Sequence, residues 1–278
     1  MPLQSRTFSP WAAVLGILLF AAQPAFANDH SITLATGTSP NDSGLLGHIL
    51  PQFEDASGLR VEVVAVSSRE ALEMSSQGRV DAVLAHLPGY ERRVMDDRIG
   101  LRQETVMSTH FVIAGPPDDP ADVRAADSAP DAFARIFAER QRFLSRGDES
   151  GAHSREMAIW EDTSVTTEDR SFGWYQQTFT GMADTINGAG AIGAYTLVDY
   201  PNWLRFGTGG GLRINYEDAE DRDLHDIYSI IVVNPDQVEG VNADGANELA
   251  DWLVSTEGQE AIRQFQIAGE YAYRPLSD

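Results

Sequence analysis

Two short polar loops carry the residues whose types could bind an anion. The first loop, residues 36–46, follows an apolar stretch, and the second, residues 145–153, precedes an amphipathic run. Each loop leads into a segment in which apolar residues have helical spacing. The first turn of a helix presents unpaired backbone N–H groups and a partial positive charge, which attract anions. The two loops therefore predict an oxyanion held between two parts of the chain.

Arg146 is the fixed cation of this predicted site. A guanidinium binds tetrahedral oxygens through charge-assisted hydrogen bonds. Alternatively, Arg146 braces its own loop by pairing with Asp148, and both roles can hold at once. Neutral donors would surround the anion, namely the hydroxyl and backbone hydrogens of Thr38, Ser39, Ser67 and Ser68. Alternatively these four residues are helix caps, and Ser68 in particular directly precedes the helix expected at 69–77.

Acidic residues near these loops would help to select the ligand. A fully deprotonated dianion offers only acceptors, whereas hydrogen phosphate carries a donor that needs a carboxylate. Asp42, Asp148 or Glu70 could supply this carboxylate, although helix capping and an arginine brace are the alternatives. Arg69 could add a second cation or pair with Glu70. An Asp184 side chain that faced the site would disfavour dianions.

Composition excludes several other chemistries. The chain has no cysteine and no lysine, which removes disulfides, thiolate and lysine nucleophiles, a Walker A loop and a pyridoxal phosphate Schiff base. The six histidines show no paired spacing such as H-E-x-x-H, so no metal site is predicted. His153 is expected to donate to a loop carbonyl. A hydrolase that uses Ser150 and His153 is an alternative, but residues 147–151 are one residue too long for G-x-S-x-G.

The chain is strongly acidic. It has 42 aspartates and glutamates against 20 arginines, which gives a formal net charge of −22. Nucleic acids and anionic lipids need a basic face, so they are not expected partners. A surface of this charge is typical of a protein exposed to a medium of high salt concentration, because the salt screens the repulsion between like charges.

The first residues have the pattern of a secretory signal peptide. Arg6 precedes an apolar stretch at 11–22, and Ala25 and Ala27 form the A-x-A pattern of a cleavage site. The stretch is shorter than the roughly 20 apolar residues needed to span a bilayer. We therefore expect residues 1–27 to be removed on export, with a membrane anchor as the alternative.

The spacing of apolar residues predicts an α/β fold. Strands are expected at 31–36, 59–66, 81–86, 109–115, 142–145, 192–197 and 228–233. Helices are expected at 44–53, 69–77, 130–140, 151–161, 181–189, 245–254 and 256–265. Asp42 and Ser43 are expected to cap the first helix, and Pro51 to kink its last turn. The first three strands alternate with helices, and such a sheet binds ligands at the carboxyl ends of its strands.

With these segments assigned, the chain resembles the periplasmic solute-binding components of ABC transporters, and specifically the tungstate-binding family. The matching segments are 34–36, 38–39, 42–46, 145–148, 150–151 with His153, 181–182, 194–197 with Asp199, 251–253 and 257–259. The loops depart from the family in part. Gly37 and Pro40 interrupt the first run of threonines and serine, and residues 67–69 (Ser-Ser-Arg) replace a Gly-Thr-Gly stretch.

The resemblance implies a two-lobed type II solute-binding fold with two crossing strands as its hinge. Lobe I would comprise residues 28–114 and 230–278, and lobe II residues 115–229. The residues implied to contact the ligand are Thr36, Thr38, Ser39, Ser67, Ser68, Arg146, Ser150, Gly181 and Met182.

The same resemblance implies a transport function without catalysis or cofactor. A monomer in the periplasm would capture a small tetrahedral oxyanion, tungstate first and molybdate next, and pass it to a membrane ABC permease. The alternative is a repurposed relative that acts as a periplasmic sensor or binds a different anion.

Overall fold

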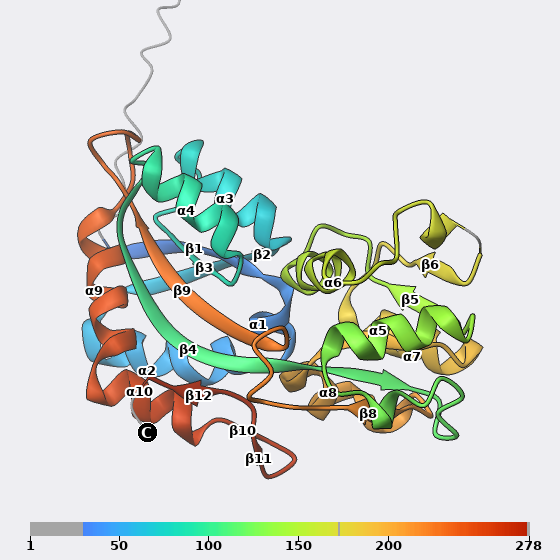
Figure 1. The fold of residues 1–278 in the computed structure, drawn as a ribbon. Helices are drawn as coiled ribbons and strands as arrows, with labels where there is room; N and C mark the ends of the chain where they lie inside the picture. The colour runs from blue at the N-terminus through green and yellow to red at the C-terminus, as the bar shows by residue number, and fades with distance from the viewer. Residues whose placement is uncertain (1–29, 172, 277–278) are drawn as a thin grey trace, which may run out of the picture.

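The computed structural model describes residues 30–276 apart from residue 172, so the predicted signal peptide lies outside the described residues. Strands and helices alternate along this part of the chain (Figure 1). The elements up to the first long strand are β1 (Ser31–Gly37), α1 (Thr38–Asp42), α2 (Leu45–Ser57), β2 (Arg60–Val66), α3 (Ser68–Ser76), β3 (Ala82–Ala85), α4 (Pro88–Asp96) and β4 (Gly100–Gly115).

The remaining elements complete a second α/β half and then return to the first. They are α5 (Ala129–Ala138), β5 (Phe143–Ser145), α6 (Gly151–Glu161), β6 (Tyr175–Gln177), α7 (Met182–Ile192), β7 (Thr196–Asp199), α8 (Tyr200–Phe206), β8 (Arg213–Tyr216), β9 (His225–Val233), α9 (Ala243–Val254), α10 (Thr256–Gln264), β10 (Gln266–Ile267), β11 (Glu270–Tyr271) and β12 (Arg274–Pro275).

The first half is a sheet covered by helices on both faces. Strand β1 lies between β2 and β3 and is parallel to both, and β9 and β4 extend the sheet beyond β3. Helices α3 and α4 pack on one face, while α2, α9 and α10 cover the other (Figure 1). Strand β3 is buried along its whole length, which explains its continuous apolar sequence.

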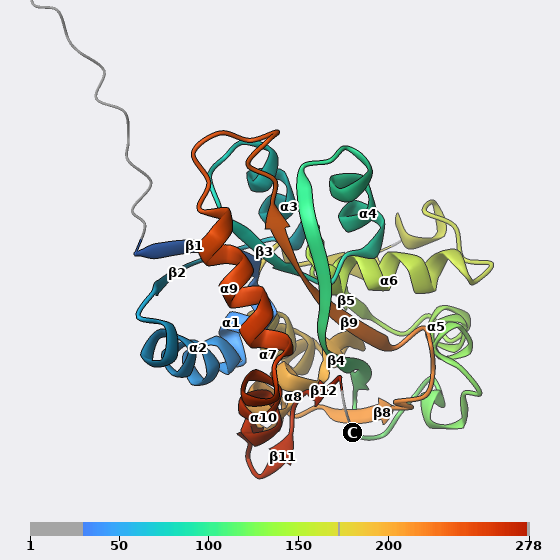
Figure 2. The same cartoon turned by 90° about the vertical axis from the view of Figure 1, so that its left-hand side faces the viewer.

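Strand β4 connects the two halves of the molecule. Its first part pairs with β9 in antiparallel register, from Gly100 opposite Val233 to His110 opposite His225. Its last part, from Phe111 on, pairs with β7 and β8 and belongs to a separate apolar core with α5, α6 and α7. Figure 2 shows β4 and β9 side by side along much of their length. Among the described residues, the second half therefore has one apolar core, and the first half has one core on each face of its sheet.

The predicted βαβαβ order of the first three strands is confirmed, and helix α6 has the predicted bounds. Several details were wrong: helices α4 and α8 were not predicted, and the strand expected at 109–115, β4, begins at Gly100. Helix α2 continues past Pro51 to Ser57, because the carbonyl that loses its donor belongs to the exposed Gly47 and can bond to water. The residue at its N-cap position is Gly44, which has a left-handed conformation, so neither Asp42 nor Ser43 is the cap. The strand expected at 192–197 begins only at Thr196, because α7 runs on to Ile192.

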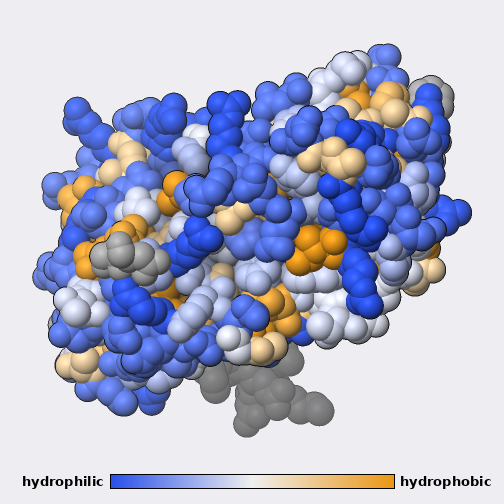
Figure 3. Space-filling model, turned by 60° about the horizontal axis from the view of Figure 1, so that its bottom comes forward, coloured by the Kyte–Doolittle hydropathy of each residue, from blue (hydrophilic) through white to orange (hydrophobic). Residues whose placement is uncertain are grey.

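The surface agrees with the acidic composition. On the face in Figure 3, hydrophilic residues cover most of the area, and apolar residues form small separate patches. Among residues 30–276, residue 172 aside, no helix combines the length and apolar character needed to cross a membrane.

Candidate anion-binding site

The carboxyl ends of the three parallel strands bring together segments that are distant in sequence. Strand β1 ends at Gly37, β2 ends just before Ser67, and β3 ends just before His86. Because parallel strands present these ends at one edge of the sheet, the residues that follow them are neighbours. The N-terminus of α6, from the other half, faces this edge, and the imidazole of His86 lies directly against Gly151.

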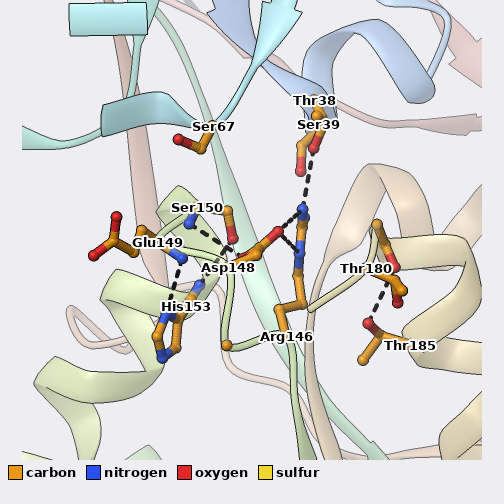
Figure 4. Close-up of polar contacts among 12 residues, drawn as sticks. Thr38, Ser39, Ser67, Arg146, Asp148, Glu149, Ser150, His153, Thr180 and Thr185 are labelled. Carbon is orange, nitrogen blue, oxygen red and sulfur yellow. Dashed lines mark hydrogen bonds and ion pairs between the residues drawn. The ribbon is translucent and has the colours of Figure 1, made fainter. Parts of the chain in front are cut away.

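Arg146 reaches across from the second half to this edge (Figure 4). It follows β5, and only 3% of its surface is exposed. Its Nε and Nη2 donate to one carboxylate oxygen of Asp148 at 3.0 and 2.5 Å, and Nη2 also donates to Thr38 Oγ1 at 3.2 Å. The other oxygen of Asp148 accepts the backbone N–H of Ser150. The predicted brace is therefore present, and it leaves Nη1 of Arg146 buried without a hydrogen-bond partner.

Ser67 and Ser68 have different roles at the start of α3. The side chain of Ser67 accepts the backbone N–H of Glu70 at 3.2 Å and so caps the helix. The interpretation of Ser68 as the cap is wrong. Its hydroxyl is buried, has no hydrogen-bond partner, and lies 2.9 Å from the position that a Cβ on Gly37 would occupy. Ser68 therefore directs an unused donor toward the end of β1.

Two predicted hydroxyls are already engaged within the protein. Thr36 is fully buried in β1, and its Oγ1 donates to the carbonyl of Leu84 on β3 at 2.9 Å. Ser39 donates to the carboxylate of Asp199 at 3.1 Å, which joins the two halves. The hydroxyl of either residue would have to leave its present acceptor before it could donate to a ligand.

The remaining predicted residues lie at the starts of two helices in the second half. Ser150 caps α6, since its Oγ accepts the backbone N–H of His153 at 3.3 Å. Gly181 occupies the capping position of α7 without a side-chain bond. Met182 is buried in the core of the second half. Ser150 is thus brought beside Arg146, whereas Met182 serves packing.

His86 is a residue of this site that sequence reasoning did not select. Its Nδ1 lies 2.8 Å from a carboxylate oxygen of Asp226, and its ring stacks on Tyr228 with centroids 4.4 Å apart. Burial lowers the pKa of His86, but the charge and hydrogen bond of Asp226 outweigh this effect, so the pKa is raised. The sequence did offer one sign of this role, because His86 directly follows the third parallel strand, and ligands bind at the carboxyl ends of such strands.

Asp199 is the second residue that was missed as a site residue. It caps α8, and its carboxylate also accepts the side-chain N–H of Asn202 at 2.8 Å. Burial raises the pKa of Asp199 above the usual aspartate range, although these hydrogen bonds and Arg146 oppose the shift. The buried carboxylate of Asp199 therefore lies beside Ser39, and Ser39 belongs to the loop that is predicted to contact an anion.

The other charged candidates lie at the outer rim. Arg69 forms ion pairs with Glu73 on its own helix and with Glu149 across the two halves, both at 2.9 Å. A pocket of about 320 Å³ borders this pair and Ser67. Glu70 and Asp184 are exposed, and the side chain of Glu70 is not among the contacts of Arg69. The positive charge of Arg69 is thus already balanced by Glu73 and Glu149.

His153 does not behave as expected. Its Nδ1 accepts the backbone N–H of Glu149 at 3.1 Å instead of donating to a carbonyl. Burial lowers the pKa of this imidazole, which suits a neutral acceptor. Because Ser150 Oγ acts as a helix cap, the two side chains are not arranged as nucleophile and base. Across the described residues, no cluster of three or more histidine, aspartate or glutamate side chains is placed to hold a metal ion.

Comparisons with known proteins identify the family of the chain. A family model described as a PBP superfamily domain matches residues 22–257. The tungstate-binding protein TupA of Peptoclostridium acidaminophilum is 35% identical over 237 residues, which are 84% of this chain and 81% of that protein. A putative ABC transporter anion-binding protein of Haloferax volcanii is 36% identical over 247 residues, 88% of this chain and 71% of the relative.

A solved structure shares the fold. The tungstate-binding protein TupA from Desulfovibrio alaskensis matches with a TM-score of 0.77 and 33% identity, over 89% of this chain and 99% of that structure. The two-lobed α/β fold expected from the sequence is thus confirmed. The chain belongs to the PBP superfamily and, within it, to the family of the tungstate-binding proteins.

Proposed function

We propose that this protein captures a tetrahedral oxyanion, tungstate first and molybdate next, for an ABC permease. The observation that supports this most directly is a pair of buried donors without protein partners, Nη1 of Arg146 and the hydroxyl of Ser68. One comes from each half, and both lie near the segment that joins Gly37 to Thr38. An unpaired buried polar group costs about 1–3 kcal/mol, and a ligand with several acceptor oxygens would recover that cost.

The carboxylates near the site favour a fully deprotonated dianion. Both oxygens of Asp148 already accept hydrogen bonds, from Arg146 and from Ser150. Both oxygens of Asp199 also accept, from Asn202 and Ser39. Hydrogen phosphate would need one of these acceptors for its own proton, whereas tungstate, molybdate and sulfate need none. Among these dianions, the names of the relatives support tungstate.

Capture would involve closure of two lobes around the anion, lobe I comprising residues 28–114 and 230–278 and lobe II residues 115–229. Strands β4 and β9 would form the hinge. Hydrogen bonds from Arg146 to Thr38 and from Ser39 to Asp199, and the Arg69–Glu149 ion pair, would hold the closed form. Closure would remove water from the anion and strengthen its contacts with Arg146.

We place this activity in the periplasm and assign no cofactor and no covalent chemistry to it. The donors named here all come from one chain, so a monomer would suffice. An ABC permease would be the receiving partner, in keeping with the name of the Haloferax volcanii relative.

Calorimetric titration of the mature protein, stripped of ligand, would test the proposal. Tungstate and molybdate should bind, tungstate more tightly, and phosphate should not. The Arg146→Ala variant should lose this binding. The matched control is Arg142→Ala, because Arg142 lies in the same segment but donates to the carbonyl of Ile192. If the wild-type protein bound none of tungstate, molybdate and sulfate, or if Arg146→Ala bound tungstate with wild-type affinity, the proposal would be contradicted.

A further inference from the structure

The charges around the candidate site do not suit a dianion if Arg146 is the only cation. Asp148 pairs with Arg146 and neutralises it. Two further carboxylates, Asp199 and Asp226, are buried close by, with at most 2% of their surface exposed. A dianion placed here would meet like charges in a region of low dielectric, where repulsion is strong. Another positive charge among the residues that line this edge would offset this repulsion.

His86 is placed to supply that charge. Its Nε2 lies 3.6 Å from the position that a Cβ on Gly37 would occupy, and Ser68 Oγ lies 2.9 Å from the same position. The ring also lies so close to Gly151 that any side chain there would overlap Nε2. Nε2 thus faces the meeting point of the β1 loop, Ser68 and the start of α6. The Ser68 hydroxyl at this point has no partner in the protein.

We propose that His86 is the second cation of the anion site and donates its Nε2–H to the bound oxyanion. This inference rests on the proposed function. Asp226 would hold the ring through Nδ1–H, so that Nε2 is the nitrogen presented to the ligand.

The chemistry of imidazole makes protonation decisive. With Nδ1–H donated to Asp226, a neutral ring leaves a lone pair on Nε2. That lone pair would repel an oxyanion, which offers only acceptors. A protonated ring converts Nε2 into a charged donor that tungstate can use, whereas the neutral form could accept only from hydrogen phosphate. The protonation of His86 therefore sets both the strength and the selectivity of binding.

The groups that face His86 favour its charged form. From β9 come the carboxylate of Asp226 and the stacked ring of Tyr228. Asp199 at the end of β7 and Glu91 on α4 add negative charge, and they raise the pKa of His86 together with Asp226, against the effect of burial. The start of α6 at Gly151 adds the positive end of a helix dipole, which acts in the opposite direction.

The test combines titration with tungstate and nitrogen NMR. Tungstate affinity of the wild-type protein should fall as pH rises through the titration of His86. His86→Gln should weaken binding by about ten- to a hundredfold where the wild-type ring is charged, because a hydrogen bond to a charged group is lost. It should also remove the pH dependence. In wild-type protein labelled at histidine nitrogen, Nε2 of His86 should carry a proton in the tungstate complex.

His110→Gln is the matched control. His110 likewise contacts a carboxylate, Glu217 at 2.9 Å, and stacks on a tyrosine, Tyr200, but it lies outside the site. This variant should keep wild-type affinity and pH dependence.

The outcomes separate the two proposals. Wild-type protein that binds none of the oxyanions overturns the proposed function and this inference together. Binding that is lost with Arg146→Ala but kept at full strength with His86→Gln overturns this inference alone. If His86→Gln fails to fold, the NMR measurement decides, because an unprotonated Nε2 in the wild-type complex also refutes the role of His86.

Discussion

Arg146 and Ser68 each keep one buried polar atom without a protein partner, and the two atoms differ in what removal would cost the fold. The guanidinium of Arg146 is also held by Asp148 and Thr38, so its loss would disturb the loop as well as the site. The hydroxyl of Ser68 makes no hydrogen bond, so its loss should affect ligand binding only. Ser68 is therefore the cleaner position at which to separate function from stability.

We predict that Ser68→Ala lowers tungstate affinity without lowering the stability of the free protein. One neutral hydrogen bond contributes about 0.5–1.5 kcal/mol, so the dissociation constant should rise by about two- to tenfold. Removal of a buried unpaired hydroxyl should leave the free energy of unfolding equal or higher. Calorimetry and urea denaturation would measure the two quantities.

Ser75→Ala on the same helix is the matched control. Its buried hydroxyl donates to the carbonyl of Leu72, so this variant should be less stable but bind normally. Equal effects of the two variants on affinity would contradict the assignment of Ser68 to the site.

Glu156 should make stability depend on pH. It is buried on α6 and accepts hydrogen bonds from Trp160 Nε1 at 3.1 Å and from the Tyr175 hydroxyl at 2.7 Å. Burial raises its pKa to about 7, although these hydrogen bonds oppose the shift. A pKa raised in the folded state contributes stability that is fully present below the unfolded value and is lost as pH rises through about 7.

We therefore predict that Glu156→Gln loses less stability than the wild type between pH 5 and 8. The difference between the two proteins should change by at most about 3 kcal/mol over this range. Urea denaturation at several pH values would measure it. Glu91, whose pKa burial also raises to about 7, remains in both proteins, so the variant should keep part of the dependence. Parallel curves would show that Glu156 does not titrate in this range.

At the scale of elements, local sequence signals explain most of what could be predicted. Helix α6 begins directly after Ser150, which caps it, and the amphipathic run at 151–161 predicted this start. Helix α8 was missed although Asp199 caps it and Pro201 follows in its first turn. The contact of His86 with Asp226 joins residues 140 positions apart, and no local pattern encodes it. The sequence predicted that the two polar loops lie on either side of one anion site. Only the packed structure shows which buried hydroxyls beside this site have no hydrogen-bond partner.

The start of α6 supplies a prediction about closure. Because a side chain at Gly151 would overlap His86, the two halves can meet there only if residue 151 is glycine. Gly151→Ala should weaken tungstate binding about tenfold or more, since overpacking costs about 1–3 kcal/mol. Gly89→Ala is the control, because a Cβ at Gly89 near the start of α4 meets open space. Unchanged tungstate affinity in Gly151→Ala would show that closure does not need this contact.

At the scale of the whole molecule, like charge acts against the compact state. The formal net charge is −22, and the chain has no cysteine with which to form a disulfide. The ion pairs at the rim, such as Arg69 with Glu149, are exposed and contribute about 1 kcal/mol or less. Mutual repulsion of surface carboxylates therefore acts on a fold held by its apolar cores, and salt that screens this repulsion should stabilise it.

We predict that the thermal midpoint at neutral pH rises with sodium chloride from low to molar concentration, because the Debye length falls from about 10 Å at 0.1 M to about 3 Å at 1 M. Chloride is the appropriate salt, since sulfate is itself a candidate ligand and would stabilise by binding. The control is the same series at pH 4.5, the isoelectric point expected from the sequence, where little net charge remains to be screened. A midpoint that does not change with salt at neutral pH, or that rises equally at both pH values, would rule out charge repulsion as the cause.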